Sequence, residues 1–500
     1  MKTTVKQSNT GWRVIILLLG LLAAVRVVLF SAAFPFFSVV DEQAHFDLVT
    51  RYAHAEPPRT LSHISEVAMP YVVCFGTPEY LHTPESQPGG VFRPPWKLAP
   101  DELKVWMAPR TQFWRETFRN HEASQPPLYY TLAGGWWRIG QALGCKENSR
   151  LLWLRCLNAL ILMAVVGLAG VTAIKVFPDN RFIQVAVPAL AAFFPQSMFY
   201  AINNDMLCPL TFGAAFLLLT TFCEAEKPGA GLAAATGLAL AAVFLTKINN
   251  LPLLAVAGGW VGLKTLSLFR AGRLRATLTP LAVLFACATV PMAAWMAWCK
   301  CNFGDLTGTA EKVQFLNWQD KPVNEWLHHP LFTAQGCWFF LKTNLATFWQ
   351  GEQLWHFQPL AIPEVGLVYV LLTLGALALT LAALVRPRSG FTTPQRRALA
   401  FGFLCCAAML AFFALLSVKY DFQDCFYPSR AHPFFVSGRL LLGMLIPFLL
   451  LFAAGLDRLM LNFQMQTKFF LLVVLLGFML GCEVATDLPV FGSEYNWWHQ

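Results

Sequence analysis

MKTTVKQSNTGWRVIILLLGLLAAVRVVLFSAAF, residues 1–34, is the stretch that decides the class of this protein. Basic and polar residues come first, and an apolar run of about 20 residues follows, which is enough to cross about 30 Å of hydrocarbon. A secretory signal peptide has the same order, but its apolar region is only about 7–15 residues long. The stretch therefore predicts a first membrane helix that is retained.

The whole chain has the composition of a membrane protein. Of its 500 residues, 56% are hydrophobic and 13% are charged, whereas about a quarter of the residues in a soluble domain are charged. The net charge of +9 does not indicate nucleic-acid binding, because the Lys and Arg residues form short clusters between apolar runs, a pattern typical of membrane orientation. We expect membrane lipids as partners and no nucleic acid.

Eleven segments are apolar and long enough, or nearly long enough, to span a bilayer. They are residues 13–34, 151–174, 182–202, 206–223, 229–246, 249–268, 278–299, 363–385, 398–418, 436–456 and 467–487. We predict an all-α polytopic membrane protein that forms one membrane domain over residues 1–500. About eleven transmembrane helices are expected, within a range of about ten to thirteen.

Clusters of basic residues predict the orientation, because short loops rich in Lys and Arg stay in the cytoplasm. The clusters are Lys2, Lys6 and Arg13; Arg270, Arg273 and Arg275; and Arg386, Arg388, Arg396 and Arg397. If all three are cytoplasmic, the N-terminus is cytoplasmic too. The C-terminus and the loops at 35–150, 300–362 and 419–435 are then outside.

PPLYYTLAGGWWRIGQALG, residues 126–144, is apolar enough to resemble a further span. Counting it as a crossing would put Arg386 and Arg397 on the opposite side of the membrane from the N-terminus. Since it also carries Arg138 and two Trp residues, we expect an interfacial or re-entrant helix within a long first outer loop. Such long loops are more often functional than mere spacers.

The sharpest polar feature is FPFFSVVDEQAHFDLVTRYAHAEPP, residues 34–58, at the outer end of the first span. In a helix, Asp41 and His45 would share a face, with Glu42 beside them. Acidic residues at the edge of an apolar bundle are costly and are typical of ion, proton or substrate handling. Equally, Asp41 and Glu42 would suit the start of an interfacial helix. These residues alone leave both interpretations open.

Two further polar stretches border the same expected face. HEASQPPLYY, residues 121–130, starts the interfacial helix with Tyr129 and Tyr130 near headgroup depth. FFPQSMFYAINNDMLCP, residues 193–209, places Asn204 and Asp205 at an outer turn. An aromatic belt and ordinary turn chemistry explain these residues without any function.

Two cations lie where the positive-inside preference disfavours them. Lys247, in LTKINNLP, and Arg439, in SGRLLLGMLIP, are both expected at outer ends of spans. Each needs an anion nearby, and a phosphate is a natural partner for a guanidinium. The alternatives are snorkelling for Lys247 and an ion pair of Arg439 with Asp421 or Asp424. Motifs of soluble enzymes, such as Walker A, GxSxG and HExxH, are absent from the sequence.

A series of short motifs, taken in order, supports a family resemblance. They are Asp41-Glu42 with His45, Gln125 to Tyr130, Arg155 with Asn158, Phe194 to Gln196, Asn203 to Asp205, Lys247, Phe348 to Gly351, and Ser437 to Leu440. Together they resemble the GT-C superfamily of membrane glycosyltransferases and, more closely, a family of large bacterial membrane proteins of undefined function grouped with it. Gln125 stands where a His is usual, and Leu440 where a Tyr is usual.

The resemblance implies an activity and a GT-C-like fold. Members of the superfamily transfer a sugar from a polyprenyl-phosphate carrier to an envelope glycan, lipid or protein acceptor on the outer face of the membrane. It implies Asp41 as the catalytic base of an inverting transfer, with Glu42 beside it. It also implies a bacterial inner-membrane location. The substrate-binding residues implied are His45, Gln125, Tyr129, Asn204, Asp205, Lys247, His432 and Arg439, with the cations on the departing phosphate.

A cofactor is left open by the resemblance. Some relatives use a divalent metal held by acids of the outer loops. Here Asp41, Glu42 and Asp205 carry oxygens suited to such an ion, but nothing in the sequence brings them together. No metal ligand set is therefore assigned.

Two other functions remain as alternatives. A transporter or flippase of a lipid-linked or envelope glycan would carry paired charges at mid-membrane positions and repeat symmetry, and the sequence makes neither evident. A non-catalytic membrane assembly protein would keep its function after Asp41→Asn.

Overall fold

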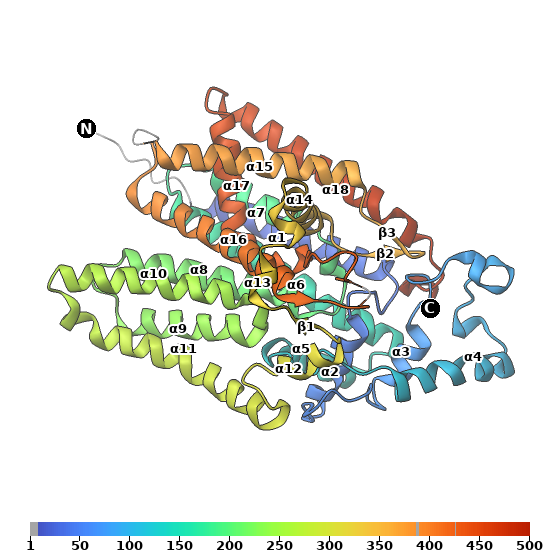
Figure 1. Ribbon diagram of the computed structural model, residues 1–500. Helices are drawn as coiled ribbons and strands as arrows, with labels where there is room; N and C mark the ends of the chain where they lie inside the picture. Colours follow the sequence, from blue (N-terminus) through green and yellow to red (C-terminus); the bar gives the residue numbers. More distant parts are fainter. Residues whose placement is uncertain (1–8, 387–389, 426) are drawn as a thin grey trace.

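The computed structural model describes residues 9–386, 390–425 and 427–500 and is almost entirely helical (Figure 1). Three of the basic residues that predict the orientation, Lys2, Lys6 and Arg388, lie outside these described residues.

Nine helical segments of the described residues are long and apolar enough to cross a membrane. They contain α1 (Asn9–Ala33), α6 (Glu147–Val176), α8 (Cys208–Glu224), α10 (Leu251–Arg270), α11 (Leu274–Phe303), α15 (Pro363–Val385), α16 (Thr393–Lys419), α17 (Leu445–Leu459) and α18 (Met465–Phe491). Short 3-10 segments lengthen α8, α10 and α17 at their starts, and the one before α17, Gly438–Met444, has seven residues. The predicted class, an all-α polytopic membrane protein, is confirmed.

The other two predicted spans form shorter helices, α7 (Arg181–Ala192) and α9 (Ala230–Thr246). The helix predicted over 182–202 is wrong in its second half, because α7 ends at Ala192. Pro195 lacks a backbone donor and disfavours helix in the residue before it. The Gln196 side chain then caps a separate 3-10 turn, Ser197–Tyr200, by accepting a hydrogen bond from the Met198 N–H.

The segment 126–144 forms one helix, α5 (Leu128–Ala142), and it is not among the long apolar helices. It packs against α2 (Glu42–Ala53) and α6. A Cβ at Gly134 would lie 2.9 Å from the backbone nitrogen of Ala53, so a glycine is needed for this close approach. In this way α5 fixes the helix that begins beside Asp41.

Three loops meet at one end of the bundle, and we name them in chain order the first (35–150), second (300–362) and third loop (419–435). The first carries α2, α3 (Met69–Phe75), α4 (Pro100–Gln112) and α5; the second carries α12 (Thr309–Phe315), α13 (Val323–Trp326) and α14 (Ala334–Gln350). Figure 1 shows α3 and α4 at the right, α2, α5 and α12 at the lower centre, α13 and α14 nearer the middle, and the turn between α10 and α11 at the left.

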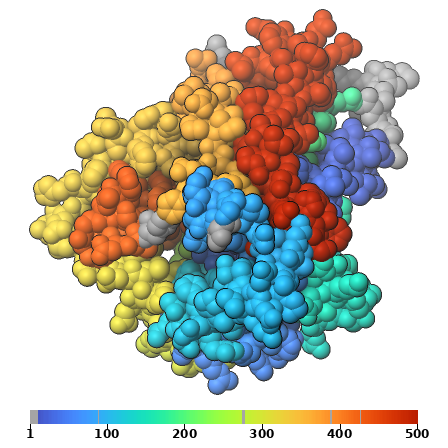
Figure 2. Space-filling view, turned by 90° about the vertical axis from the view of Figure 1, so that its right-hand side faces the viewer, coloured from blue at the N-terminus to red at the C-terminus, as the bar shows by residue number. Residues whose placement is uncertain are grey.

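Backbone contacts join the three loops. Strand β1 (Gln319–Asp320) of the second loop pairs antiparallel with β4 (Tyr420–Asp421) of the third. A hairpin of β2 (Leu354–Trp355) and β3 (Gln358–Pro359) lies beside the first loop, where the His356 N–H donates to the Glu79 carbonyl. Figure 2, viewed from this end, shows all three loops and the C-terminal segment forming one face.

Candidate functional site

Asp41 joins α1 to α2 with an unusual backbone. Its φ of 64° and ψ of 21° lie in the left-handed region, which few residues other than glycine adopt, Asp among them. The side chain makes no capping hydrogen bond to α2. Asp41 therefore holds the N-cap position, and Glu42 lies in the first turn, but the Asp41 carboxylate does not cap the helix.

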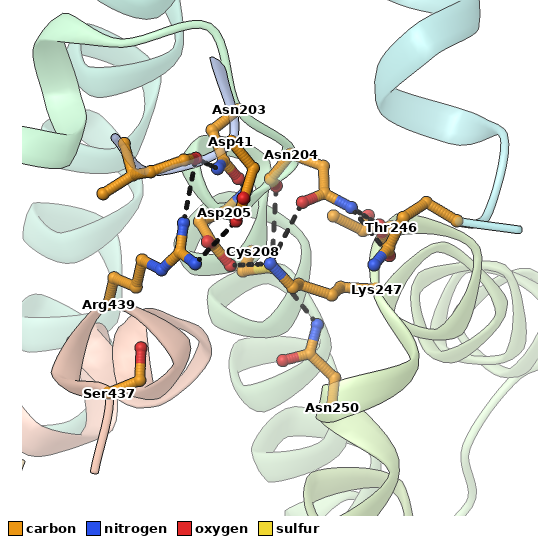
Figure 3. Close-up of polar contacts among 12 residues, drawn as sticks. Asp41, Asn203, Asn204, Asp205, Cys208, Thr246, Lys247, Asn250, Ser437 and Arg439 are labelled. Atoms are coloured by element: carbon orange, nitrogen blue, oxygen red, sulfur yellow. Dashed lines mark hydrogen bonds and ion pairs between the residues drawn. The ribbon is translucent and has the colours of Figure 1, made fainter. Parts of the chain in front are cut away.

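The Asp41 carboxylate lies between a cation and an imidazole. Its Oδ2 accepts a hydrogen bond from Nη2 of Arg439 at 3.1 Å, and its Oδ1 is 3.3 Å from Nε2 of His121. Arg439 also donates to the carbonyl of Val40 at 3.1 Å (Figure 3). The Asp41 side chain remains 25% exposed. Residues 398 positions apart thus meet at a solvent-accessible point.

The anion predicted beside Arg439 is present, but it is not Asp421 or Asp424. Asp421 pairs instead with Arg430 at 3.2 Å. Besides Asp41, Arg439 faces Glu352 at the end of α14, with 3.6 Å between Nε and Oε2. The Ser437 hydroxyl lies 2.8 Å from one Glu352 oxygen and 2.9 Å from the other.

A second ion pair lies deeper, at the start of α8. Nζ of Lys247 is 2.6 Å from Asp205 and donates to Oδ1 of Asn204 at 3.1 Å. Figure 3 shows Asp205 between the two cations, Arg439 and Lys247. Nδ2 of Asn204 donates to the Gln125 side chain at 3.1 Å. Four predicted substrate-binding residues, Gln125, Asn204, Asp205 and Lys247, are therefore in direct contact.

Glu122 connects the two ion pairs into one network. It accepts from Gln125 at 2.5 Å, lies 2.5 Å from Nζ of Lys312 in α12, and is 3.5 Å from His121. We call this set the loop network. Its members are Asp41, His121, Glu122, Gln125, Asn204, Asp205, Lys247, Lys312, Glu352, Ser437 and Arg439.

The acids of the loop network differ in their proton affinity. Burial acts to raise the pKa of Asp41, but His121 and the charge of Arg439 outweigh it and hold that pKa well below its usual range. Burial also acts to raise the pKa of Glu122, but the charge of Lys312 outweighs it, and the pKa of Glu122 is lowered. At Glu352 burial wins, and its pKa is raised despite the neighbouring Arg439. The network therefore combines two acids whose pKa is lowered, Asp41 and Glu122, with one whose pKa is raised, Glu352.

Glu42, the neighbour of Asp41 in sequence, points into the protein. Its two oxygens accept from Nε and Nη2 of Arg155 at 2.9 and 2.8 Å, and from the N–H groups of Ser38 and Ile202 at 2.9 Å each. Both side chains of the Glu42–Arg155 pair are fully buried. Arg155 also donates to three carbonyls at the end of α1, those of Ser31, Phe34 and Pro35.

The three remaining predicted residues lie in different places. His45 is buried, with Nδ1 at 2.7 Å from the Tyr130 hydroxyl. Burial lowers the pKa of His45 to about 3, so its imidazole is neutral. Tyr129 is buried edge-to-face against Tyr130. His432 is exposed on the third loop, and its side chain contacts no network member in the part of the chain that the structure describes.

The loop network also contains a set of metal-ligand types that the sequence did not predict. Ligand atoms of Asp41, His121 and Glu122 lie within 4.8 Å of one another. Carboxylate oxygen and imidazole nitrogen suit several divalent ions. However, Arg439 and Lys312 already neutralise both carboxylates, and an ion would compete with them. The earlier set is not assembled, because Glu42 is occupied by Arg155 and Asp205 by Lys247.

Sequence reasoning missed His121, Glu122, Lys312 and Glu352. His121 and Glu122 begin the stretch HEASQPPLYY, and Glu352 directly follows the motif Phe348 to Gly351. The proximity of these ionisable residues to the motifs was the available signal. It also missed an ion pair inside the membrane bundle, between Arg26 of α1 and Glu483 of α18, at 2.5 Å. Paired charges are therefore present between two helices that are long and apolar enough to span a membrane.

Comparison with known proteins adds a family and no activity. Residues 25–420 match the model of a family described as "Predicted membrane protein (DUF2142)". This range contains Asp41, Glu122, Lys247 and Glu352, and it ends before Arg439. No curated protein matches the chain.

Proposed function

We infer that this chain, which belongs to the DUF2142 family of predicted membrane proteins, is a membrane glycosyltransferase of the GT-C type. In this proposal it transfers a sugar from a polyprenyl-phosphate carrier to an envelope glycan, lipid or protein acceptor. The three loops face outward from a bacterial inner membrane, and the N-terminus is cytoplasmic. The loop network, at the mouth of the bundle, is the active site.

One observation carries the proposal: the contact between the part-exposed Asp41 and Arg439. In inverting transfer the acceptor oxygen bonds to the anomeric carbon, the bond from that carbon to the carrier phosphate breaks, and the acceptor proton passes to a base. Asp41 is ionised and accessible, so we assign it as that base. Arg439, 3.1 Å away, is placed to stabilise the charge that builds on the departing phosphate.

The second cation, Lys247, supports the same chemistry from deeper in the bundle. The negative charge on the carrier phosphate rises as the sugar leaves. Two nearby cations stabilise that charge more than one does. Asp205 lies 2.6 Å from Lys247 and holds it in the absence of donor. Gln125 and Asn204 then act as positioning residues that link this pair to Glu122.

The geometry changes three roles in the proposal. Glu42 becomes a structural residue, because Arg155 and two backbone N–H groups occupy its oxygens. Glu352 enters as a second carboxylate, because it faces Arg439 and has a raised pKa. His432 leaves the proposed site, since it is exposed away from the network.

The test is genetic and chemical. Deleting the gene should cause one polyprenyl-phosphate sugar to accumulate, detected by mass spectrometry of lipid extracts, and should remove a sugar from the envelope. The wild-type gene should reverse both effects. Asp41→Asn should not, at equal protein level, because it lacks the base. As a matched control, Glu364→Gln removes an exposed carboxylate at the start of α15 and should behave as wild type. Full reversal by Asp41→Asn would refute the assignment.

A transporter or flippase of a lipid-linked or envelope glycan remains the second candidate, because the Arg26–Glu483 pair lies between α1 and α18 within the bundle. The two functions differ in one requirement. A transferase works on donor and acceptor mixed in detergent, whereas a transporter needs two separated compartments. Sugar transfer by the detergent-solubilised protein supports the enzyme. Movement of the lipid-linked sugar across vesicles without transfer would support the transporter.

A further inference from the structure

A small cavity lies inside the bundle, away from the loop network. Its walls are the end of α14 at Gln350, Tyr369 of α15, and Glu483, Thr486 and Asp487 of α18. Its volume is about 10 Å³, close to what a single water molecule requires. No residue of this cavity takes part in the proposed transfer reaction.

Glu483 is fully compensated. Nη1 of Arg26 lies 2.5 and 2.7 Å from its two oxygens, and the Tyr200 hydroxyl donates to the first of them. Arg26 also donates to the Phe194 carbonyl at 3.1 Å. The charge of Arg26 is thus paired with the carboxylate of Glu483.

Asp487 is different. It follows Glu483 by one helical turn on the same face of α18 and is only 2% exposed. Within residues 9–386, 390–425 and 427–500 its carboxyl group makes no hydrogen bond and no ion pair. The titratable and charged side chains around it are Glu483, Arg26, Tyr80, Tyr200, Tyr369 and Cys482. Arg26 is therefore the single cation in a group with two carboxyls.

A second polar group at the cavity is also unmatched. The hydroxyl of Tyr369 is buried and has no hydrogen-bond partner, although buried hydroxyls nearly always have one. Thr486 of α18 lines the same space. Gln350, by contrast, is engaged with the backbone N–H and carbonyl of Ile362. The cavity is thus lined by one unpaired carboxyl group, that of Asp487, and one unmatched hydroxyl, that of Tyr369.

An ionised carboxylate that is buried without a partner is strongly disfavoured, so Asp487, 2% exposed, requires a positive charge. A divalent cation needs six or more oxygens and, for Mg²⁺, several retained waters, which a space of about 10 Å³ does not hold. A proton needs a single carboxyl oxygen. We propose that this cavity is a proton-binding site, in which Asp487 carries the proton and one water links it to Tyr369.

Proton release would leave two carboxylates beside one Arg26. Because Arg26 holds α1 against α18, the proton-loaded form should be the more stable one. The stability of the folded protein should therefore fall as the pH rises, and removing the Asp487 charge should remove this effect. This inference is independent of the proposed transferase activity and stands or falls separately from it.

The test is the melting temperature of the full-length protein in detergent between about pH 6 and about pH 9, with choline chloride as the salt. The wild type should lose about 2 °C or more over this range relative to Asp487→Asn, whose side chain does not titrate. Glu364→Gln, the exposed carboxylate control, should keep the wild-type dependence. The same pH dependence in Asp487→Asn and wild type would overturn the proposal.

Two further measurements separate a bound proton from a bound metal cation and test the protonation of Asp487 directly. If sodium chloride, but not choline chloride, restores the stability of the wild type at high pH, the cavity binds a metal cation and the proton assignment is wrong. Infrared spectra of the wild type should show the carbonyl band of a buried protonated carboxyl group, absent from Asp487→Asn. Its absence from the wild type at about pH 6 would also refute the proposal, even if the variant failed to fold.

Discussion

Two groups of charged residues, the loop network and the Arg26–Glu483–Asp487 cluster, use the same side-chain types in opposite ways. In the loop network, Asp41 and Arg439 are 25% and 16% exposed, and each acid faces a cation. In the membrane cluster, Arg26 and Glu483 are 5% and 2% exposed, and Asp487 has no cation of its own. The first group is therefore partly open to bulk solvent, whereas the second is shielded from it.

The difference follows from where each group lies. The loop network joins residues of the first and second loops with the end of α9 and the starts of α8 and α17. Its outer acids, Asp41 and Glu352, are partly exposed, whereas its deeper pair, Asp205 and Lys247, is buried. The membrane cluster joins two long helices, and any imbalance of charge there must be relieved inside hydrocarbon. Accessibility to solvent is therefore what separates the proposed active site from the proposed proton site.

The same contrast appears between two adjacent residues, Asp41 and Glu42, and gives the largest expected effect on folding. Glu42→Gln leaves the fully buried Arg155 without a counter-charge and should destabilise the protein by about 3–5 kcal/mol. Asp41→Asn, at a part-exposed position, should cost less than about 1 kcal/mol. Thermal unfolding in detergent compares the two. Equal losses of stability in the two variants would mean that Asp41 also has a structural role. The proposed difference between Asp41 and Glu42 would then be wrong.

His45 gives the next largest effect, through pH. Its pKa is about 3 in the folded protein and about 6.5 when unfolded, so the unfolded chain binds more protons between these values. Its contribution to stability is therefore complete above about pH 6.5 and is lost as the pH falls toward 3. From pH 7 to pH 5 the loss is about 2 kcal/mol.

His45→Gln removes this titration and should reduce the acid sensitivity of the melting temperature by that amount. His82→Gln is the matched control, because His82 is exposed in the same loop; it should retain the wild-type pH profile. If both variants behave alike, the buried His45 is not the source of the acid sensitivity.

The fold could largely be predicted from sequence, because the length of an apolar run sets the length of a membrane helix. The exception, residues 182–202, arose because hydropathy does not register that Pro195 ends a helix. The bounds of α9 also matched the predicted 229–246 closely, although this helix is short. Orientation relative to the membrane stays a prediction.

The candidate site could be predicted only in part. Lys247 and Arg439 stood out because a cation at that depth needs an anion, and the structure supplies Asp205 and Asp41. Partners could not be assigned, since Arg439 is 398 residues from Asp41 and Arg26 is 457 residues from Glu483. Such pairs depend on tertiary packing, which local patterns do not encode. The catalytic role of Asp41 stays a prediction.

Arg439→Lys tests whether the loop network uses geometry as well as charge. The guanidinium contacts Asp41, the Val40 carbonyl and Glu352 from separate nitrogens, and an ammonium group cannot reproduce this fork. Sugar transfer should fall about tenfold, or about 1.4 kcal/mol, with little change in melting temperature. Lys247→Arg, which keeps the charge at the other ion pair, is the companion variant. Unchanged sugar transfer in Arg439→Lys would mean that only the positive charge of Arg439 matters, and not the geometry of its guanidinium group.

The smallest effect is expected at an ion pair that belongs to neither group. Arg115 and Glu66, in the first loop, form two hydrogen bonds at 2.8 and 3.0 Å, yet their side chains are 53% and 72% exposed. Water competes for both charges, and many such pairs contribute nothing measurable. Arg115→Ala should therefore leave the melting temperature and sugar transfer unchanged. A clear loss of either would mean that short distance, rather than burial or position in the loop network, determines which ion pairs matter in this protein.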